Sequence, residues 1–256
     1  MKRWLFVIGF AALVVYAVLG FDGGRSASFS LSPPDLTLEQ LRASIAGKLA
    51  ERQTDIGFEY GGNREELSER IGSLLKEAFA EDDYTAYNVE SYLYTIRTWG
   101  SSAKIKLSVT YRESALETAA VDERIRQTLP AILKGAATDR QKTRAIHDWI
   151  VTHVAYDTSL ERYTAYDALM SGSAVCQGYT LLAHRMMSYA GLESKIVEGT
   201  VASGSHVWNL VRIDGEWYHM DATWDDPVPD RPGIAGENYF LKTDAEMKRD
   251  HQWKSL

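Results

Sequence analysis

An Asp-Gly pair between two alternating runs constrains the fold of this chain more than any other feature. Residues 206–213 and 216–223 both have the character of β-strands, and only Asp214 and Gly215 separate them. A two-residue Asp-Gly loop is the strongest short-range signal for a β-hairpin. The two runs are therefore predicted to form antiparallel strands whose register the turn fixes.

The register assigns partners across this hairpin. With Ile213 opposite Glu216, Trp208 is placed opposite Asp221, which makes Asp221 a diagonal neighbour of His206. Diagonal neighbours lie ~7–8 Å apart at the backbone, a gap that a carboxylate and an imidazole can bridge with a hydrogen bond. Because side chains repeat every two residues, one face of the hairpin is predicted to carry four of them: His206, Trp208, Asp221 and Thr223.

The chain has one cysteine, Cys176, which excludes an internal disulfide and a thiolate zinc cage. It follows a small-residue turn and precedes a run with helical spacing that ends near Gly191, so it is predicted to lie in the first turn of a helix. The unpaired N–H groups and the positive dipole end of a helix N-terminus favour the thiolate, the nucleophilic form. An inert buried thiol is the alternative, since free cysteine is often buried.

These residues supply the groups of a thiol acyl-transfer site. Cys176 would attack, His206 would deprotonate it and later protonate the leaving group, and Asp221 would fix the imidazole tautomer. Gln177 and Trp208 are weaker candidates to bind an acyl oxygen or support the groove, because the backbone N–H of Cys176 is the more dependable oxyanion donor. Trp208 fits equally well as an ordinary core residue.

No cofactor and no metal site is predicted. His147 and His153 are six residues apart, which is not the i,i+4 zinc spacing, so capping and core packing explain them better. Three acids in a loop with prolines are interpreted as solvated: Asp225, Asp226 and Asp230. The chain carries 28 Lys and Arg against 35 Asp and Glu, a net charge of −7 with the wrong sign for binding nucleic acid.

The N-terminus predicts where the protein resides. Residues 4–20 are uncharged and follow Lys2 and Arg3, a pattern typical of an export signal or a membrane anchor. The length of this run suits both, so cleavage stays open. We expect residues 1–28 to be a signal peptide or anchor, and the main body to be extracytoplasmic, either secreted or attached to the membrane through residues 4–20.

Residues 29–113 are predicted to form a small α+β domain. Thr37 and Gln40 form a capping box that starts a helix at about residue 38, and Asn63 starts a second helix. The hydrophobic period then changes from 3.6 to 2 over residues 92–111, which predicts a β-hairpin with one wet face. No cluster of residues in this part suggests chemistry.

A second domain is predicted over residues 114–256. Ser114 and Glu117 form a capping box for a helix that we expect Pro130 to interrupt. Asp139 is the expected cap of the next helix.

Three blocks occur in order in this second domain: Val-Cys-Gln-Gly-Tyr at 175–179, Ser-His-Val-Trp-Asn at 205–209, and Trp-Tyr-His-Met-Asp-Ala-Thr-Trp-Asp-Asp-Pro at 217–227. They resemble the transglutaminase-like superfamily, in particular its exported bacterial branch. The resemblance implies an α+β, papain-like fold in which a helix-start cysteine packs on an antiparallel sheet. It also assigns the family's catalytic positions to three residues: Cys176, His206 and Asp221.

The resemblance further implies acyl transfer through a thioester at amide bonds of peptides or proteins, including those of a cell envelope. Cysteine protease and transglutaminase activities both fit, because the sequence leaves open whether water or an amine accepts the acyl group. The alternative is a non-catalytic, wall-associated or protein-binding module that uses the same groove. Rapid alkylation near neutral pH would distinguish an activated thiol from an inert buried one.

Overall fold

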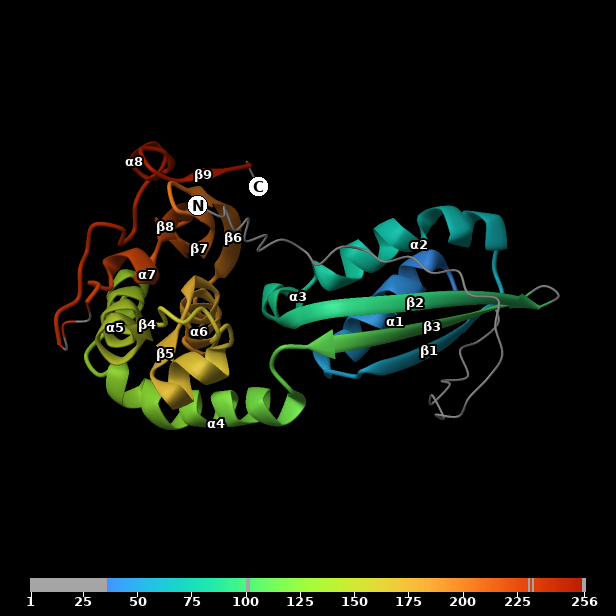
Figure 1. Cartoon of the computed structure of the whole chain (residues 1–256), viewed down its shortest axis with the longest axis horizontal. Coiled ribbons are helices and arrows are strands. Elements are labelled where there is room, and N and C mark those ends of the chain that lie inside the picture. The colour runs from blue at the N-terminus through green and yellow to red at the C-terminus, as the bar shows by residue number, and fades with distance from the viewer. Residues whose placement is uncertain (1–35, 100–101, 230, 232, 255–256) are drawn as a thin grey trace. The chain divides into compact units, whose positions relative to one another are not determined.

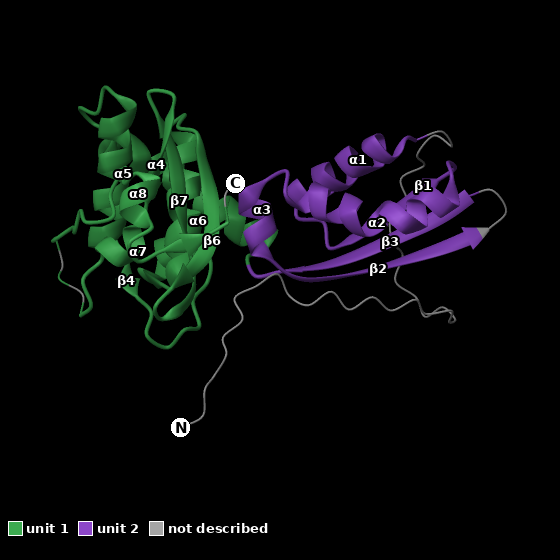
Figure 2. Cartoon of the chain, turned by 90° about the horizontal axis from the view of Figure 1, so that it is seen from above, with its two compact units in different colours: residues 1–9, 113–256 green, residues 10–112 purple. Residues whose placement is uncertain are grey.

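The computed structural model describes residues 36–99, 102–229, 231 and 233–254. These residues form two compact units, one ending at Arg112 and the other starting at Glu113 (Figure 2). The predicted signal or anchor segment, residues 1–28, lies outside the described residues. Within the part of the chain that is described, no helix is long and apolar enough to cross a membrane.

The N-terminal unit is a three-stranded antiparallel sheet with helices packed on it (Figure 1). The sheet has the order β1-β3-β2, so β3 is its central strand. A continuous apolar core joins the two longer helices, α1 and α2, to the sheet. In chain order the elements are α1 (Leu38–Ala50), β1 (Asp55–Tyr60), α2 (Arg64–Phe79), α3 (Asp83–Asn88), β2 (Val89–Trp99) and β3 (Ser102–Tyr111).

Local sequence signals set the boundaries of these elements. The Thr37 hydroxyl accepts from the Gln40 N–H at 3.2 Å, and the Gln40 side chain accepts from the Thr37 N–H at 2.9 Å, which confirms the predicted capping box. Asn63 caps α2, as predicted. The predicted hairpin is also present as β2 and β3, with Ile96 opposite Ile105.

The C-terminal unit places helices around a four-stranded antiparallel sheet of order β8-β7-β6-β9. Helix α6, which begins at the cysteine, packs on this sheet mainly against β7, so the predicted α+β class and core arrangement are confirmed. In chain order the elements are α4 (Ala115–Ile132), α5 (Asp139–His153), β4 (Ala155–Tyr156), the π-helical turn η1 (Asp167–Ser171), β5 (Ser173–Ala174), α6 (Cys176–Tyr189), β6 (Ser194–Val201), β7 (Gly204–Ile213), β8 (Glu216–Met220), α7 (Ala222–Asp225), α8 (Asp244–Met247) and β9 (Gln252–Trp253).

Two expectations about helix boundaries in this unit are wrong. Pro130 does not interrupt α4, which runs on to Ile132. Proline so close to the helix end removes a single backbone bond, and the buried Leu129 beside it keeps the turn packed. The cap of α5 is Thr138 and not Asp139, because only Thr138 lies three residues before Gln141, whose side chain returns its hydrogen bond.

Candidate active site

The hairpin of β7 and β8 has the predicted register. Ile213 lies opposite Glu216, and the pairing continues as far as Met220. Asp214 and Gly215 have φ angles of 52° and 90°, the left-handed values that a two-residue type I′ turn requires. The turn chemistry therefore fixes the strands, as the sequence indicated.

The pairing of β7 with β8 ends at Met220, one residue before Asp221. Asp221 leaves β8 and becomes the N-cap of α7, so Thr223 lies in that helix. The prediction that Thr223 shares the hairpin face of His206 is therefore wrong, and the predicted Trp208–Asp221 pair lies beyond the last strand pair, Asn209 with Met220. The physical reason is that the Asp221 carboxylate accepts the Thr223 and Trp224 N–H groups at 3.0 and 3.2 Å, which turns the chain into a helix.

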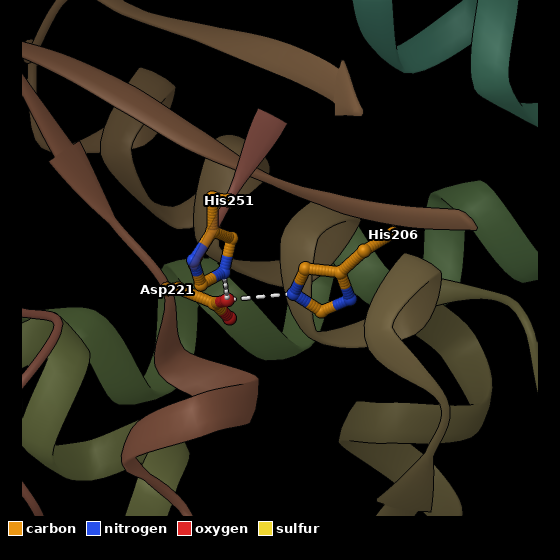
Figure 3. Close-up of side chains that lie close together, drawn as sticks. All are labelled: His206, Asp221 and His251. Carbon is orange, nitrogen blue, oxygen red and sulfur yellow. Dashed lines mark hydrogen bonds and ion pairs between the residues drawn. The ribbon is translucent and has the colours of Figure 1, made fainter. Parts of the chain in front are cut away.

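This cap leaves the other carboxylate oxygen for the imidazole. His206 Nε2 lies 2.6 Å from Asp221 Oδ2 (Figure 3). Both side chains are buried, with 6% and 1% of their surface exposed. Oδ1 of this carboxylate thus accepts two backbone N–H groups, and Oδ2 contacts an imidazole.

Cys176 is the first residue of α6 and is buried at the start of that helix. Its thiol lies near the imidazole of His206, in the wall of the same cavity, and helps to raise the pKa of that imidazole. Because Asp221 occupies Nε2, the nitrogen available to the thiol is Nδ1. A side chain is excluded at Gly178 in the same helical turn, since a Cβ there would lie 2.9 Å from the Thr164 carbonyl oxygen.

Electrostatics favour a charged imidazole in this arrangement. Burial by itself would lower the pKa of His206, but the charge of Asp221 and the hydrogen bond to it outweigh burial and raise the pKa to about 10. Burial would raise the pKa of Asp221, but the charge of His206 and the hydrogen bonds from His206 and His251 hold it below its ordinary value. At neutral pH the pair is therefore an imidazolium and a carboxylate.

These shifts predict how stability depends on pH. A raised histidine pKa stabilises the fold fully below the ordinary value of 6.5, and this contribution is lost as the pH rises to about 10. The lowered Asp221 pKa acts at the other end, and its contribution is lost as the pH falls below 3.8. We expect the difference in unfolding free energy between the wild-type protein and His206→Gln to shrink by ~1.4 kcal/mol per pH unit between pH 6.5 and 10.

Guanidinium chloride unfolding at pH 6, 8 and 9.5 measures this difference. His153→Gln is the matched control, because the side chain of His153 is exposed at the end of α5. A His206→Gln difference that is the same at all three pH values would contradict the charged pair.

The cysteine and the histidine lie in a cavity of about 1270 Å³. Three segments wall it: the loop at 156–163, the turn between β6 and β7, and residues 223–228. No lysine or arginine is among the described residues that line it. The cavity therefore places Cys176 and His206 beside a space that is lined mainly by uncharged side chains.

Neither weaker candidate is among the described residues that line this cavity. Gln177 is buried in the first turn of α6. Trp208 is fully buried, with its ring 5.8 Å from that of His206 and its Nε1 donating to His219 at 2.8 Å. Trp208 is therefore a core residue that packs beside His206, as the alternative interpretation of the sequence had it, and does not line the groove.

The interpretation of the loop acids as solvated is wrong for two of the three. Asp225 and Asp226 are only 3% and 5% exposed, because α7 turns them toward the interior of the unit. Asp225 lies 3.0 Å from His147 Nε2, and Asp226 accepts the Tyr179 hydroxyl at 2.6 Å. The third acid, Asp230, lies outside the described residues.

Sequence reasoning missed His251. This residue is fully buried, and its Nε2 lies 3.1 Å from Asp221 Oδ2 (Figure 3). It directly precedes the two-residue strand β9. No periodicity or motif in the sequence marks this position, so its residue type was the only available signal.

His206, Asp221 and His251 offer three possible metal-ligand atoms within 4.8 Å of one another. Hydrogen bonds already account for the cluster, because both imidazoles share the same oxygen of Asp221. The three side chains therefore form a hydrogen-bond network.

The comparisons with known proteins point to one family. Residues 126–222 match the model of the transglutaminase-like superfamily. Kyphoscoliosis peptidase from human and from mouse is 31% and 30% identical to this chain. Each alignment covers 47% of this chain and 22% of the relative, so the chain spans about a fifth of the length of these relatives.

A solved structure described as a TGase is similar at a TM-score of 0.40 and 12% identity, over 66% of this chain and 51% of that one. The family match includes Cys176, His206 and Asp221. The exported bacterial branch stays a prediction. Residues 126–222 of this chain are thus similar to transglutaminase-like domains.

Proposed function

We propose that the C-terminal unit catalyses thiol-dependent acyl transfer or hydrolysis at amide bonds of peptides or proteins. One observation carries the proposal: Cys176, at a helix N-terminus, lines the same cavity as a histidine whose Nε2 is held by Asp221. This arrangement has the three roles of nucleophile, proton carrier and orienting acid.

In the first half of the reaction, the Cys176 thiolate attacks the carbonyl carbon of the amide. The oxyanion that forms accepts the backbone N–H of Cys176, one of the N–H groups that a helix leaves unpaired at its start. The C–N bond then breaks as the His206 imidazolium donates its Nδ1 proton to the leaving amine. The products are a free amine, a Cys176 thioester and a neutral imidazole.

In the second half, the neutral His206 removes a proton from water or from an incoming amine. That nucleophile attacks the thioester carbonyl, and the C–S bond breaks to regenerate the thiolate and the imidazolium. Water gives a carboxylic acid and an amine gives a new amide. Asp221 stays ionised throughout and stabilises the imidazolium.

The surroundings of the thiol support an uncharged acyl donor. Lining side chains such as Tyr163, Val201 and Trp224 are apolar or aromatic, which suits peptide side chains and backbone amides. The relatives that are named peptidases support hydrolysis. The sequence pattern at residues 1–28 supports an extracytoplasmic location and cell-envelope proteins or peptides among the substrates.

The partition between water and amine can be measured directly. The full chain is incubated with dimethylated casein and a fluorescent primary amine, and both new chain ends and incorporated amine are quantified. We expect thiol-dependent product in at least one channel, and a Cys176 acyl-enzyme that mass spectrometry detects after rapid quenching. Iodoacetamide-treated protein is the control. Product formed equally by treated and untreated protein would contradict the proposal.

One observation favours the alternative of a non-catalytic binding module: Cys176 is only 5% exposed. Under that alternative the thiol is inert, and iodoacetamide should modify it no faster than an ordinary buried cysteine. Fast modification near neutral pH, lost in His206→Gln, would favour the enzyme.

A further inference from the structure

The last described segment of the chain reaches the acid of the candidate site. Strand β9 pairs with β6, placing Trp253 opposite Gly199. A Cβ at Gly199 would collide with the Gln252 carbonyl oxygen, so the glycine is what allows β9 to approach. This pairing brings the preceding residue, His251, beside Asp221. His251 lies beyond the stretch that matches the family, which ends at residue 222.

His251 shares one acceptor with the histidine of the site. Its Nε2 lies 3.1 Å from Asp221 Oδ2, the same oxygen that His206 Nε2 approaches to 2.6 Å. Its Nδ1 lies 2.6 Å from Oδ1 of Asp250. The other oxygen of Asp250 accepts the Tyr239 hydroxyl at 2.7 Å. A continuous chain of polar contacts therefore runs from the partly exposed Asp250 to the site.

Both ring nitrogens of His251 have a carboxylate oxygen as partner. An ionised carboxylate accepts hydrogen bonds but cannot donate them. His251 and Tyr239 hold the pKa of Asp250 below its ordinary value, against the effect of burial, and Asp221 is also ionised. Nε2 is therefore the ring nitrogen that can donate to Asp221, and Nδ1 faces Asp250.

Aromatic side chains enclose the imidazole of His251. The ring of His251 lies 4.5 Å from Trp224, 5.0 Å from Trp208 and 5.4 Å from Tyr239, measured between ring centroids. The three rings pack around the imidazole and leave it little room to rotate. His251 therefore offers Asp221 a donor in a fixed direction.

We propose that His251 is a positioning residue for the reaction, which holds Asp221 Oδ2 in the orientation that fixes the His206 imidazole. Without it, the contact of Oδ2 with His206 would be the only side-chain hydrogen bond left to that oxygen within the described part of the chain. His251 does not touch the reacting atoms and acts only through Asp221. The expected change in kcat rests on the proposed function, whereas the expected change in the contact between Asp221 and His206 does not.

The test compares His251→Leu with His251→Gln, because the Gln amide nitrogen can take the place of Nε2 as a donor. We expect His251→Leu to lower kcat on the casein substrate ~10–100-fold, the usual cost of losing such a supporting partner, with KM within about threefold. His251→Gln should recover most of kcat. The control is His219→Leu, since His219 is equally buried in the same aromatic cluster, where its ring nitrogens contact Trp208 and Asp244.

A second readout needs no turnover. The proton between His206 and Asp221 should give a strongly downfield imidazole N–H signal in the proton NMR spectrum, assigned by its loss in His206→Gln. We expect the signal to broaden or vanish in His251→Leu and to persist in His251→Gln and in His219→Leu. A merely structural role for His251 would not produce this pattern.

The outcomes separate the two proposals. If His251→Leu keeps both the signal and kcat within threefold, the positioning role is overturned. If the wild-type protein has no turnover at all, the proposed function fails, and the NMR signal alone decides the role of His251. Should His251→Leu not fold, His251→Asn replaces it, because its shorter side chain cannot reach Asp221. Equal kcat and equal signals in the Asn and Gln variants would then overturn the inference.

Discussion

Replacing Cys176 with alanine is expected to abolish amide-bond activity and leave the fold intact. The expected loss is at least ~10⁴-fold in kcat, because no other described side chain in the cavity can form the thioester. The fold should survive because the change removes one sulfur atom at the start of α6 and leaves the apolar stripe of that helix in place. Product formation and the thermal unfolding midpoint measure the two effects.

Two controls accompany this variant. Iodoacetamide should reproduce the loss in the wild-type protein, with mass spectrometry reporting the degree of modification. Ser188→Ala changes an exposed residue of the same helix and should leave activity within about twofold. Turnover that persists after complete alkylation of Cys176 would rule out the thioester mechanism.

Replacing Asp221 with asparagine should cost far more activity than replacing Asp214 with asparagine. The Asp221→Asn amide can still cap α7 through its oxygen, but it lacks the charge that keeps His206 protonated and can hold the ring in the wrong tautomer. The equivalent change in a serine protease triad costs ~10⁴ in kcat, which we take as the upper guide.

Asp214→Asn is a matched control for this prediction. It is the same chemical change at a residue that only shapes the turn, and asparagine tolerates the left-handed conformation found there. We expect its activity to stay within about twofold of wild type. Measuring kcat and the pKa of His206 by NMR in both variants tests the prediction. Equal losses would mean that Asp221 serves the fold and not the reaction.

Most of what the sequence predicted correctly is local. The boxes at Thr37 and Ser114 and the Asp214-Gly215 turn are present as expected. In each case the hydrogen bonds that decide the structure join residues at most a few positions apart. The start of α6 at Cys176 belongs to the same class.

The neighbourhood of His206 and Asp221 was also accessible from the sequence, although fifteen positions separate them. The two-residue turn fixes which residues of the two strands are paired, and this pairing determines which side chains are neighbours across the sheet. The same reasoning failed at Thr223, where a side-chain cap at Asp221 ended the strand. The alternation of apolar and polar residues does not show where a side-chain cap ends the strand pairing and starts a helix.

Other features depended on how distant segments pack. The burial of Asp225 and Asp226 follows from α7 turning inward against α5 and α6, and the contact of His251 follows from β9 pairing with β6. Neither segment shows hydrophobic periodicity, so the sequence does not indicate which of its side chains are buried. The sequence by itself determined the caps, the turn and the hairpin register, because short-range hydrogen bonds set them. Only the tertiary structure decided which charges are buried around Asp221, because the packing of remote segments sets their desolvation and their partners.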